Sequence, residues 1–387
     1  MPDVLFVDDG DRYSRLRLIA WWDQDRLRAA KVLVVGAGAI GNEVLKNLAL
    51  VGVGNVWVID CDQIEDSNLT RSILFRREDR GWSKATVAAD SVRGINADVR
   101  VVPIHGNVIA DIGLGLFREV DLVIACLDNR EARLWVNRCC WKVGTPWIDG
   151  GIQEISGVVK VFVPPDGACY ECGMTENDYR LINLRYSCPL LKREDLQAGR
   201  VPTAPTIASI IGGLQVQEAL KLLHGLPASA GEALVWNGVT NHFYKTSFQR
   251  REDCLSHETY SEPIEVPLST NANTAVELLT AVRGHFAGSG ELALSLDRDL
   301  VVSLECTCGF SQSMMKAQQL VGAADAKCPN CGQDTRPRLE HVIGARSLMA
   351  KETLATLGIP PFDIVRVADD KDEKVFLLAG DRERAML

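Results

Sequence analysis

Residues 31–52 read KVLVVGAGAIGNEVLKNLALVG. The run Val32–Val35 is rich in β-branched residues, as in a buried strand, and the apolar residues after the glycines recur at helical spacing. A strand, a tight turn and a helix are therefore expected, with Gly36, Gly38 and Gly41 at the turn. A phosphate can bind at such a helix N-terminus, because unpaired backbone N–H groups point outward there.

A second strand is expected at NVWVID, which ends at Asp60, 22 residues after Gly38. A nucleotide-binding α/β unit places its ribose-binding acid at about this position. Up to this point the pattern predicts a Rossmann-like, doubly wound α/β fold, and a nicotinamide-dependent oxidoreductase fits as well as an ATP-dependent enzyme.

Polar residues beyond Asp60 separate these two classes. Asp62, Asn68, Arg71 and Lys84 follow at close range. Adenylyl transfer must neutralise charge on three phosphates, whereas a dehydrogenase needs no such cluster of cations and amides. The sequence therefore favours an enzyme that breaks a nucleoside triphosphate.

An acidic residue, Asp128, follows the apolar run VDLVIACL and precedes Asn129. We expect it at the carboxyl end of a buried parallel strand, the edge at which open α/β sheets bind ligands. Because Mg²⁺ prefers carboxylate and phosphate oxygens, Asp128 is a candidate magnesium ligand.

Taken together, these motifs resemble the superfamily of ThiF, MoeB and the ubiquitin-activating enzymes, which adenylate the C-terminal glycine of ubiquitin-like proteins. The resemblance spans residues from about 11 to 257. The matching segments are GAGAIG, the stretch from Asp60 to Arg71, DRGWSK ending at Lys84, Asp128-Asn129, and TIASIIGGLQVQEALKLL at 206–223.

The resemblance implies a role for each matching residue. Near the start, RYSRL would place Arg15 on the ATP of the opposite subunit of a homodimer, although Leu16 and Ser72 depart from the family's glutamines. The residues expected to bind ATP and Mg²⁺ are Gly36, Gly38, Gly41, Asp60, Asp62, Asn68, Arg71, Lys84, Asp128 and Asn129.

The overall composition agrees with a cytoplasmic enzyme. The chain has 387 residues, 47% of them hydrophobic, and a net charge of -9, which gives no reason to expect nucleic-acid binding. We find no apolar run of about 18 residues that could cross a membrane, and no signal peptide.

Cysteine spacing predicts two zinc sites. Cys169 and Cys172 form C-x-x-C, and the resemblance places a partner pair at Cys254 and His257, where most members use two cysteines. An unmetallated C-x-x-C is the alternative. The second set, in CTCGF and KCPNCG, predicts a zinc knuckle inserted at 305–335. Its four thiols are Cys306, Cys308, Cys328 and Cys331.

A further cysteine, Cys188, lies in a polar segment at 173–205 that is expected to be a long loop. The family's crossover loop carries its catalytic cysteine in this region. A thiolate there could attack the acyl-adenylate and hold the carrier as a thioester, helped by cationic neighbours such as Lys192 and Arg193. A zinc-associated or merely exposed cysteine remains the alternative.

The chain is expected to divide near residue 265, into an adenylation domain at 1–265 and a smaller α+β domain at 266–387. The proline-containing stretch 262–274 indicates a linker. Beyond it we expect a helix at 274–286, a hairpin at 291–306 that turns at D-R-D, a short helix at 351–358, and a second hairpin at 361–380. This order fits a β-grasp, or ubiquitin-like, fold.

In eukaryotic-type activating enzymes, a C-terminal domain of this kind recruits the conjugating enzyme. We therefore expect ATP-dependent activation of a ubiquitin-like protein with a C-terminal glycine, followed by a thioester on Cys188 and transfer to a conjugating enzyme. Two alternatives stay open: a sulfur-carrier adenylyltransferase without an obligatory thioester, and a non-catalytic adaptor that kept the fold.

Overall fold

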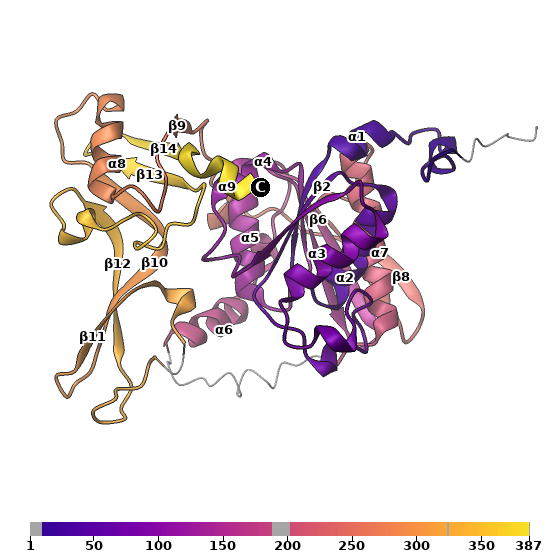
Figure 1. Cartoon of the computed structure of the whole chain (residues 1–387), viewed down its shortest axis with the longest axis horizontal. Coiled ribbons are helices and arrows are strands. Elements are labelled where there is room, and N and C mark those ends of the chain that lie inside the picture. Colours follow the sequence, from indigo (N-terminus) through magenta and orange to yellow (C-terminus); the bar gives the residue numbers. More distant parts are fainter. Residues whose placement is uncertain (1–9, 188–201, 323–324, 387) are drawn as a thin grey trace, which may run out of the picture.

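The computed structural model describes residues 10–187, 202–322 and 325–386. Two β-sheets, each with its own helices, make up these residues (Figure 1). The first sheet has eight strands in the order β3-β2-β1-β4-β5-β6-β7-β8. Its strands are β1 (Lys31–Val35), β2 (Asn55–Asp60), β3 (Arg100–His105), β4 (Leu122–Ala125), β5 (Trp147–Gln153), β6 (Ser156–Phe162), β7 (Glu232–Asn237) and β8 (His242–Ser247).

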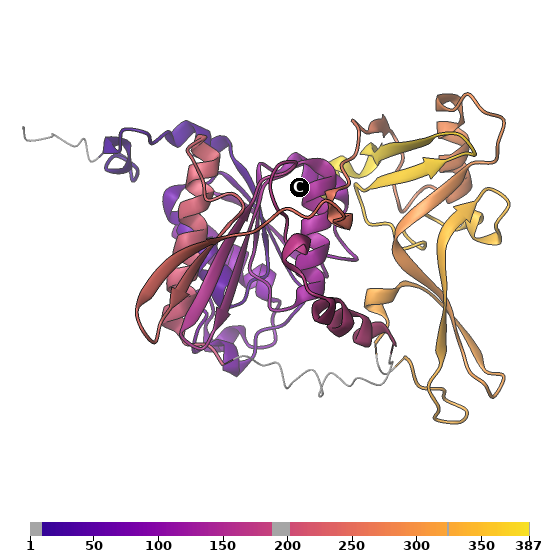
Figure 2. The ribbon, with the colours of Figure 1, turned by 180° about the vertical axis from the view of Figure 1, so that it is seen from behind.

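The first five strands in sequence are parallel, and β6, β7 and β8 continue the sheet as antiparallel strands. Helices cover both faces of the parallel half, which confirms the doubly wound α/β prediction (Figure 2). The helices of this part are α1 (Gln24–Ala29), α2 (Ala39–Val51), α3 (Lys84–Ile95), α4 (Leu114–Glu119), α5 (Arg130–Val143), α6 (Glu176–Ser187) and α7 (Pro205–His224).

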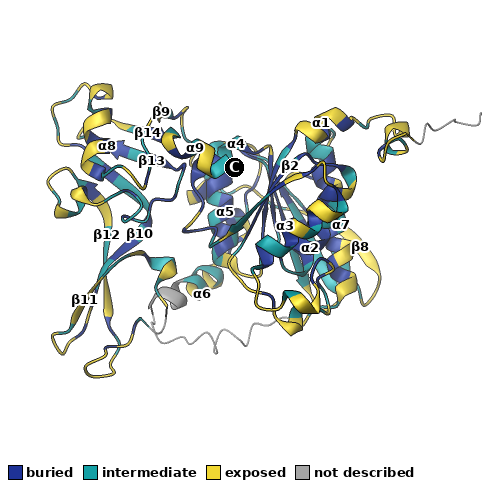
Figure 3. Ribbon diagram, in the orientation of Figure 1, coloured by how far each residue is buried: buried dark blue, intermediate teal, exposed yellow. Residues whose placement is uncertain are grey.

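Strand β1 shows why the parallel half is buried on both faces. Val32 and Val34 point into the core shared with α2, α3 and α7, whereas Leu33 and Val35 point into the core shared with α4 and α5. Because side chains alternate along a strand, an unbroken apolar run is what a strand between two helical layers requires. In the colouring by burial, the strands between the helices are mostly buried, whereas the helices carry exposed residues on their outer faces (Figure 3).

The second sheet has six strands in the order β11-β10-β13-β14-β9, with β12 also paired to β10. Helix α8 (Ala275–Val282) buries Ala275, Leu278, Leu279 and Val282 in the core of this part, at the spacing of one helix face. The remaining elements are β9 (Ile264–Val266), β10 (Ala293–Glu305), β11 (Ser311–Ala317), β12 (Arg336–Gly344), β13 (Ile364–Ala368), β14 (Glu373–Leu378) and α9 (Arg382–Met386).

The second sheet shares a core with the first, because Phe362, Ile364 and Leu377 belong to the same apolar cluster as α4 and α5. A buried ion pair crosses the same contact: Arg298 Nη1 lies 2.8 Å from Asp363 Oδ2. The guanidinium also donates to the carbonyls of Ile109 and Ile112, before α4. The two sheets are therefore joined by apolar packing and by charge.

Three predictions for the second part are wrong. Residues 291–306 form no hairpin: β10 runs straight through D-R-D, because Arg298 is buried against the first part and Asp297 pairs with Lys142 at 2.9 Å instead of facing water. The stretch 262–274 is not all linker, since β9 pairs in parallel with β14.

The third error is the helix expected at 351–358. The backbone N–H groups of Leu354 and Ala355 donate to the carbonyls of Asn273 and Thr270, so they are not available for helical bonds. The hairpin at 361–380 is confirmed by the antiparallel pair β13–β14. None of the helices among the described residues is long and apolar enough to span a bilayer.

Candidate functional site

The glycine turn after β1 is built by close backbone contacts. A Cβ on Gly41 would lie 2.0 Å from the carbonyl oxygen of Gly36, and Gly36 itself has a φ of 97°, so both positions require glycine. A Cβ on Gly38 would meet no atom within 4 Å. Gly38 therefore faces open space at the N-terminus of α2, whereas Gly41 is packed beneath the turn.

Asn42, which the sequence reading did not single out, holds this turn in place. Its buried amide nitrogen donates to the carbonyls of Ala37 and Gly38, at 2.7 and 3.0 Å. Its oxygen accepts the backbone N–H of Leu74 at 2.8 Å. A single asparagine in a helical pattern is as typical of an exposed helix position, so the sequence alone does not predict this role.

Asp60, at the end of β2, connects the turn to the next loop. One carboxylate oxygen accepts the backbone N–H of Ala37 at 2.7 Å and the other accepts that of Asp62 at 2.8 Å. Burial raises the pKa of Asp60, while the nearby Lys84 ammonium and these two N–H donors act in the opposite direction. The carboxylate thus borders the glycine turn.

The cationic residues lie on the loop and helix that follow β2. Lys84, in the first turn of α3, is only 11% exposed and pairs with Asp62 at 2.8 Å. Arg71 donates to the carbonyl of Ser67 at 2.8 Å, and the Asn68 side chain accepts the backbone N–H of Glu65 at 2.9 Å. Two cations and an amide are therefore held beside the turn.

Asp128 lies just beyond β4 and is exposed. Its described partner is the amide of Asn129, at 3.4 Å, and Asn129 in turn caps α5 by accepting the N–H of Ala132. Arg133 holds the loop after β4 in place, since it donates to Asp149 and to the carbonyls of Leu127 and Gly150. The Asp128 carboxylate is left open to a ligand.

The glycine turn, Asp60, the two cations and Asp128 line one cavity of about 1790 Å³. It continues past the parallel strands over β6 and β8, where Lys160, Tyr170, Tyr244 and Phe248 form part of the wall. Arg15 is exposed and does not line this cavity. Of the residues expected to bind the nucleotide, every one except Gly41 lines it: Gly36, Gly38, Asp60, Asp62, Asn68, Arg71, Lys84, Asp128 and Asn129.

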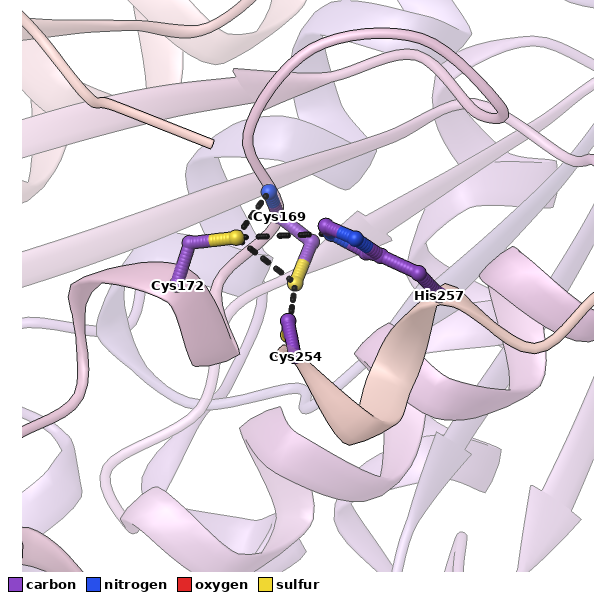
Figure 4. A group of neighbouring side chains, drawn as sticks. All are labelled: Cys169, Cys172, Cys254 and His257. Carbon is purple, nitrogen blue, oxygen red and sulfur yellow. Dashed lines mark hydrogen bonds between the residues drawn. The ribbon is translucent and has the colours of Figure 1, made fainter. Parts of the chain in front are cut away.

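The first predicted metal cluster is assembled in space, although its two halves are 85 residues apart (Figure 4). Cys169 Sγ lies 3.7 Å from that of Cys172 and 3.5 Å from that of Cys254, and the Cys172 sulfur lies 3.3 Å from His257 Nε2. Disulfide sulfurs would be about 2.0 Å apart, whereas thiolates around a tetrahedral Zn²⁺ are about 3.8 Å apart. The spacing fits a metal and excludes a disulfide.

Two neighbours support this cluster. The ring of Trp141 stacks on His257, with centroids 5.1 Å apart. Glu171, between the two cysteines of the first pair, accepts hydrogen bonds from Arg138, from Tyr179 of α6 and from Ser256. Because Ser256 lies between Cys254 and His257, these bonds join the two halves of the cluster to each other and to α6. Although burial opposes its ionisation, the bonds from Arg138 and Ser256 lower the pKa of Glu171.

The second predicted cluster lies on two connections, one between β10 and β11 and the other between β11 and β12. Cys306 Sγ is 3.5 Å from that of Cys331, and Cys308 Sγ is 3.6 Å from that of Cys328. All four sulfurs lie within 4.8 Å of one another. Each pair sits on a glycine turn, at Gly309 and Gly332 with positive φ, so this group also has the geometry of a tetrahedral metal site.

Cys188 lies outside the described residues, directly after α6. Part of the segment expected as a loop, 173–205, is helical, because α6 occupies 176–187. Thr175 and Asp178 stabilise its start, with the Asp178 carboxylate accepting the Thr175 N–H at 2.9 Å. A salt bridge of 2.8 Å from Arg130 to Asp178 also joins this start to α5.

Comparison with known proteins gives a family match: the model of the ThiF family matches residues 11–256. SUMO-activating enzyme subunit 2 of Dictyostelium discoideum is 42% identical over 42% of this chain and 25% of its own length. A sulfur carrier protein adenylyltransferase of Thermus thermophilus is 32% identical over 63% of this chain and 89% of its own.

Among solved structures, Escherichia coli MccB with ATP is similar, with a TM-score of 0.53 and 27% identity. The match covers 65% of this chain and 74% of MccB. This chain thus spans a quarter of the Dictyostelium relative and most of the Thermus one.

Proposed function

Because this chain belongs to the ThiF family, we propose that it uses ATP and Mg²⁺ to adenylate the C-terminal carboxylate of a ubiquitin-like carrier protein. One observation carries the proposal: the open turn at Gly38, the Lys84–Asp62 pair, Arg71 and Asp128 share a single cavity. A dehydrogenase would need the turn and Asp60 but not the two cations and the exposed acid.

In this reaction the carrier's terminal carboxylate attacks the α-phosphorus, the bond to the bridging oxygen breaks, and pyrophosphate leaves. The N-terminus of α2 at Gly38 binds phosphate, and the Asp60 carboxylate accepts a hydrogen bond from a ribose hydroxyl. Arg71 and Lys84 stabilise the charge that develops on the phosphates. To do so, Lys84 leaves its ion pair with Asp62 and binds a phosphate oxygen instead. Mg²⁺ held by Asp128 would neutralise phosphate charge.

Alanine at Gly38 and at Gly41 should have opposite consequences. Gly38→Ala adds a methyl group to open space, so we expect unchanged stability and a KM for ATP raised about tenfold or more, because the methyl group occupies phosphate space. Gly41→Ala forces the turn apart and should cost about 1–3 kcal/mol of unfolding free energy. Urea unfolding and ATP–pyrophosphate exchange measure both; a Gly38→Ala enzyme with an unaltered KM would contradict this placement.

For the second step we propose that Cys188 takes the acyl group as a thioester, displacing AMP, and passes it to a conjugating enzyme that binds the second part of the chain. The rival is a sulfur-carrier adenylyltransferase, which the Thermus relative favours. We further propose a homodimer in which Arg15 acts on the partner's ATP, since Arg15 does not line the cavity of its own chain.

The Cys188→Ala variant tests the second step. We expect it to keep adenylation and to lose a carrier adduct that thiols cleave, because only the acceptor sulfur is removed. Electrophoresis of samples prepared with and without dithiothreitol detects the adduct. A wild-type enzyme that forms no adduct would favour the sulfur-carrier alternative. Cys139→Ala, at a cysteine outside the cavity and both clusters, is the matched control.

We also propose that both cysteine clusters hold zinc, because their sulfur spacings fit a tetrahedral ion. Metal analysis of the purified chain should give about two zinc ions. Cys254→Ser should lower this to about one and destabilise the chain, whereas Cys139→Ala, in α5 and outside both clusters, should leave the zinc content unchanged. Less than one zinc ion in the wild type would show that at least one cluster stays unmetallated.

A further inference from the structure

Lys160 of β6 is in register, across neighbouring strands, with the last residue of β1 before the glycine turn. Val35 of β1 is paired with Ala125 of β4, Ala125 with Asp149 of β5, and Asp149 with Lys160 of β6. Neighbouring strands are about 4.8 Å apart, so the row places Lys160 about 14 Å from the residue that leads into the glycine turn. Lys160 lines the same cavity as that turn.

Lys160 is also a cation that forms no ion pair among the described residues. Its ammonium lies 5.2 Å from the centroid of the Tyr170 ring and 5.4 Å from that of Phe248. The two carboxylates that act on its charge are each bound to an arginine at 2.8 Å, Asp149 to Arg133 and Asp178 to Arg130. Within 10–187, 202–322 and 325–386, no acidic group forms an ion pair with Lys160.

This environment is unusual for a lysine, which ordinarily extends its ammonium into water. Here burial lowers the pKa of Lys160, although the Asp149 carboxylate acts in the opposite direction. An ammonium in such a place attracts an anionic group more strongly than one at an open surface does. An ion-pair partner for Lys160 is therefore best supplied by a ligand that enters the cavity.

We propose that Lys160 selects the carrier protein by pairing with an acidic side chain in its C-terminal tail, about four residues before the carboxylate that reacts. This inference rests on the proposed adenylation. An extended peptide advances about 3.3–3.6 Å per residue, so about four residues span the distance from Lys160 to the glycine turn. Tyr170 and Phe248 provide apolar walls for the tail.

Synthetic peptides that end in Gly-Gly provide the test, with Glu, Gln or Lys placed third, fourth or fifth from the C-terminus. The full chain is assayed for peptide-dependent ATP–pyrophosphate exchange. We expect the kcat/KM of the wild type to favour Glu over Lys about tenfold at one of these positions, because a like charge is rejected there. Lys160→Glu should reverse the preference and Lys160→Gln should remove it, with the KM for ATP unchanged.

Lys316→Glu, which changes an exposed lysine on β11, should keep the wild-type preference. Exchange that shows no charge preference, or a preference that Lys160→Glu retains, overturns the role of Lys160 and leaves the adenylation standing. A wild type that performs no exchange with any peptide contradicts the adenylation itself.

Discussion

Asp128→Ala is expected to reduce carrier-dependent ATP–pyrophosphate exchange by a factor of about 100 or more. The carboxylate borders the cavity at the carboxyl end of β4, and it is the exposed acid best placed to hold Mg²⁺ on the phosphates. Removing one group that stabilises charge only in the transition state typically costs about 10²–10³ in rate.

Stability should not change, because Asp128 is exposed and its described contact is a 3.4 Å approach to Asn129. Asp25→Ala is the matched control, since Asp25 is an exposed acid on α1, outside the cavity. If Asp128→Ala exchanges pyrophosphate as fast as the wild type, the metal lies elsewhere. If the wild type shows no exchange with any carrier, the chain is a non-catalytic adaptor.

Arg298→Ala is expected to lower the free energy of unfolding by about 3–5 kcal/mol. Arg298 is 6% exposed, and its loss leaves the Asp363 carboxylate buried without its counter-ion. The carbonyls of Ile109 and Ile112 lose their donors as well. Because these groups lie between the two sheets, the second sheet should separate from the first before the first sheet unfolds.

Urea unfolding measures the loss. Arg346→Ala, at an exposed arginine that pairs loosely with Glu291, should change stability by no more than about 0.5 kcal/mol. A loss below about 1 kcal/mol for Arg298→Ala would mean that apolar packing alone joins the two sheets.

The nucleotide end of the molecule was predictable because its signals are local. A glycine turn, an acid at the end of β2 and an acid just beyond β4 each follow an apolar strand, and parallel strands bring their carboxyl ends to one edge. The structure places Gly38, Asp60 and Asp128 on one cavity there.

Other features depend on long-range contacts, and no local pattern encodes them. The D-R-D sequence predicts a turn unless Arg298 is known to reach Asp363, 65 residues away. Asn42, Glu171 and Lys160 are ordinary polar residues in the sequence, and only the packing around them gives each a role.

Label transfer from ATP tests directly whether this chain adenylates a carrier protein. The Cys188→Ala chain, which cannot displace AMP from the carrier, is mixed with Mg²⁺, ATP labelled at the α-phosphate and a glycine-terminated carrier protein. We expect that pyrophosphate is released and that labelled AMP becomes attached to the carrier. Release of ADP, or no label on the carrier while ATP is bound, would contradict it.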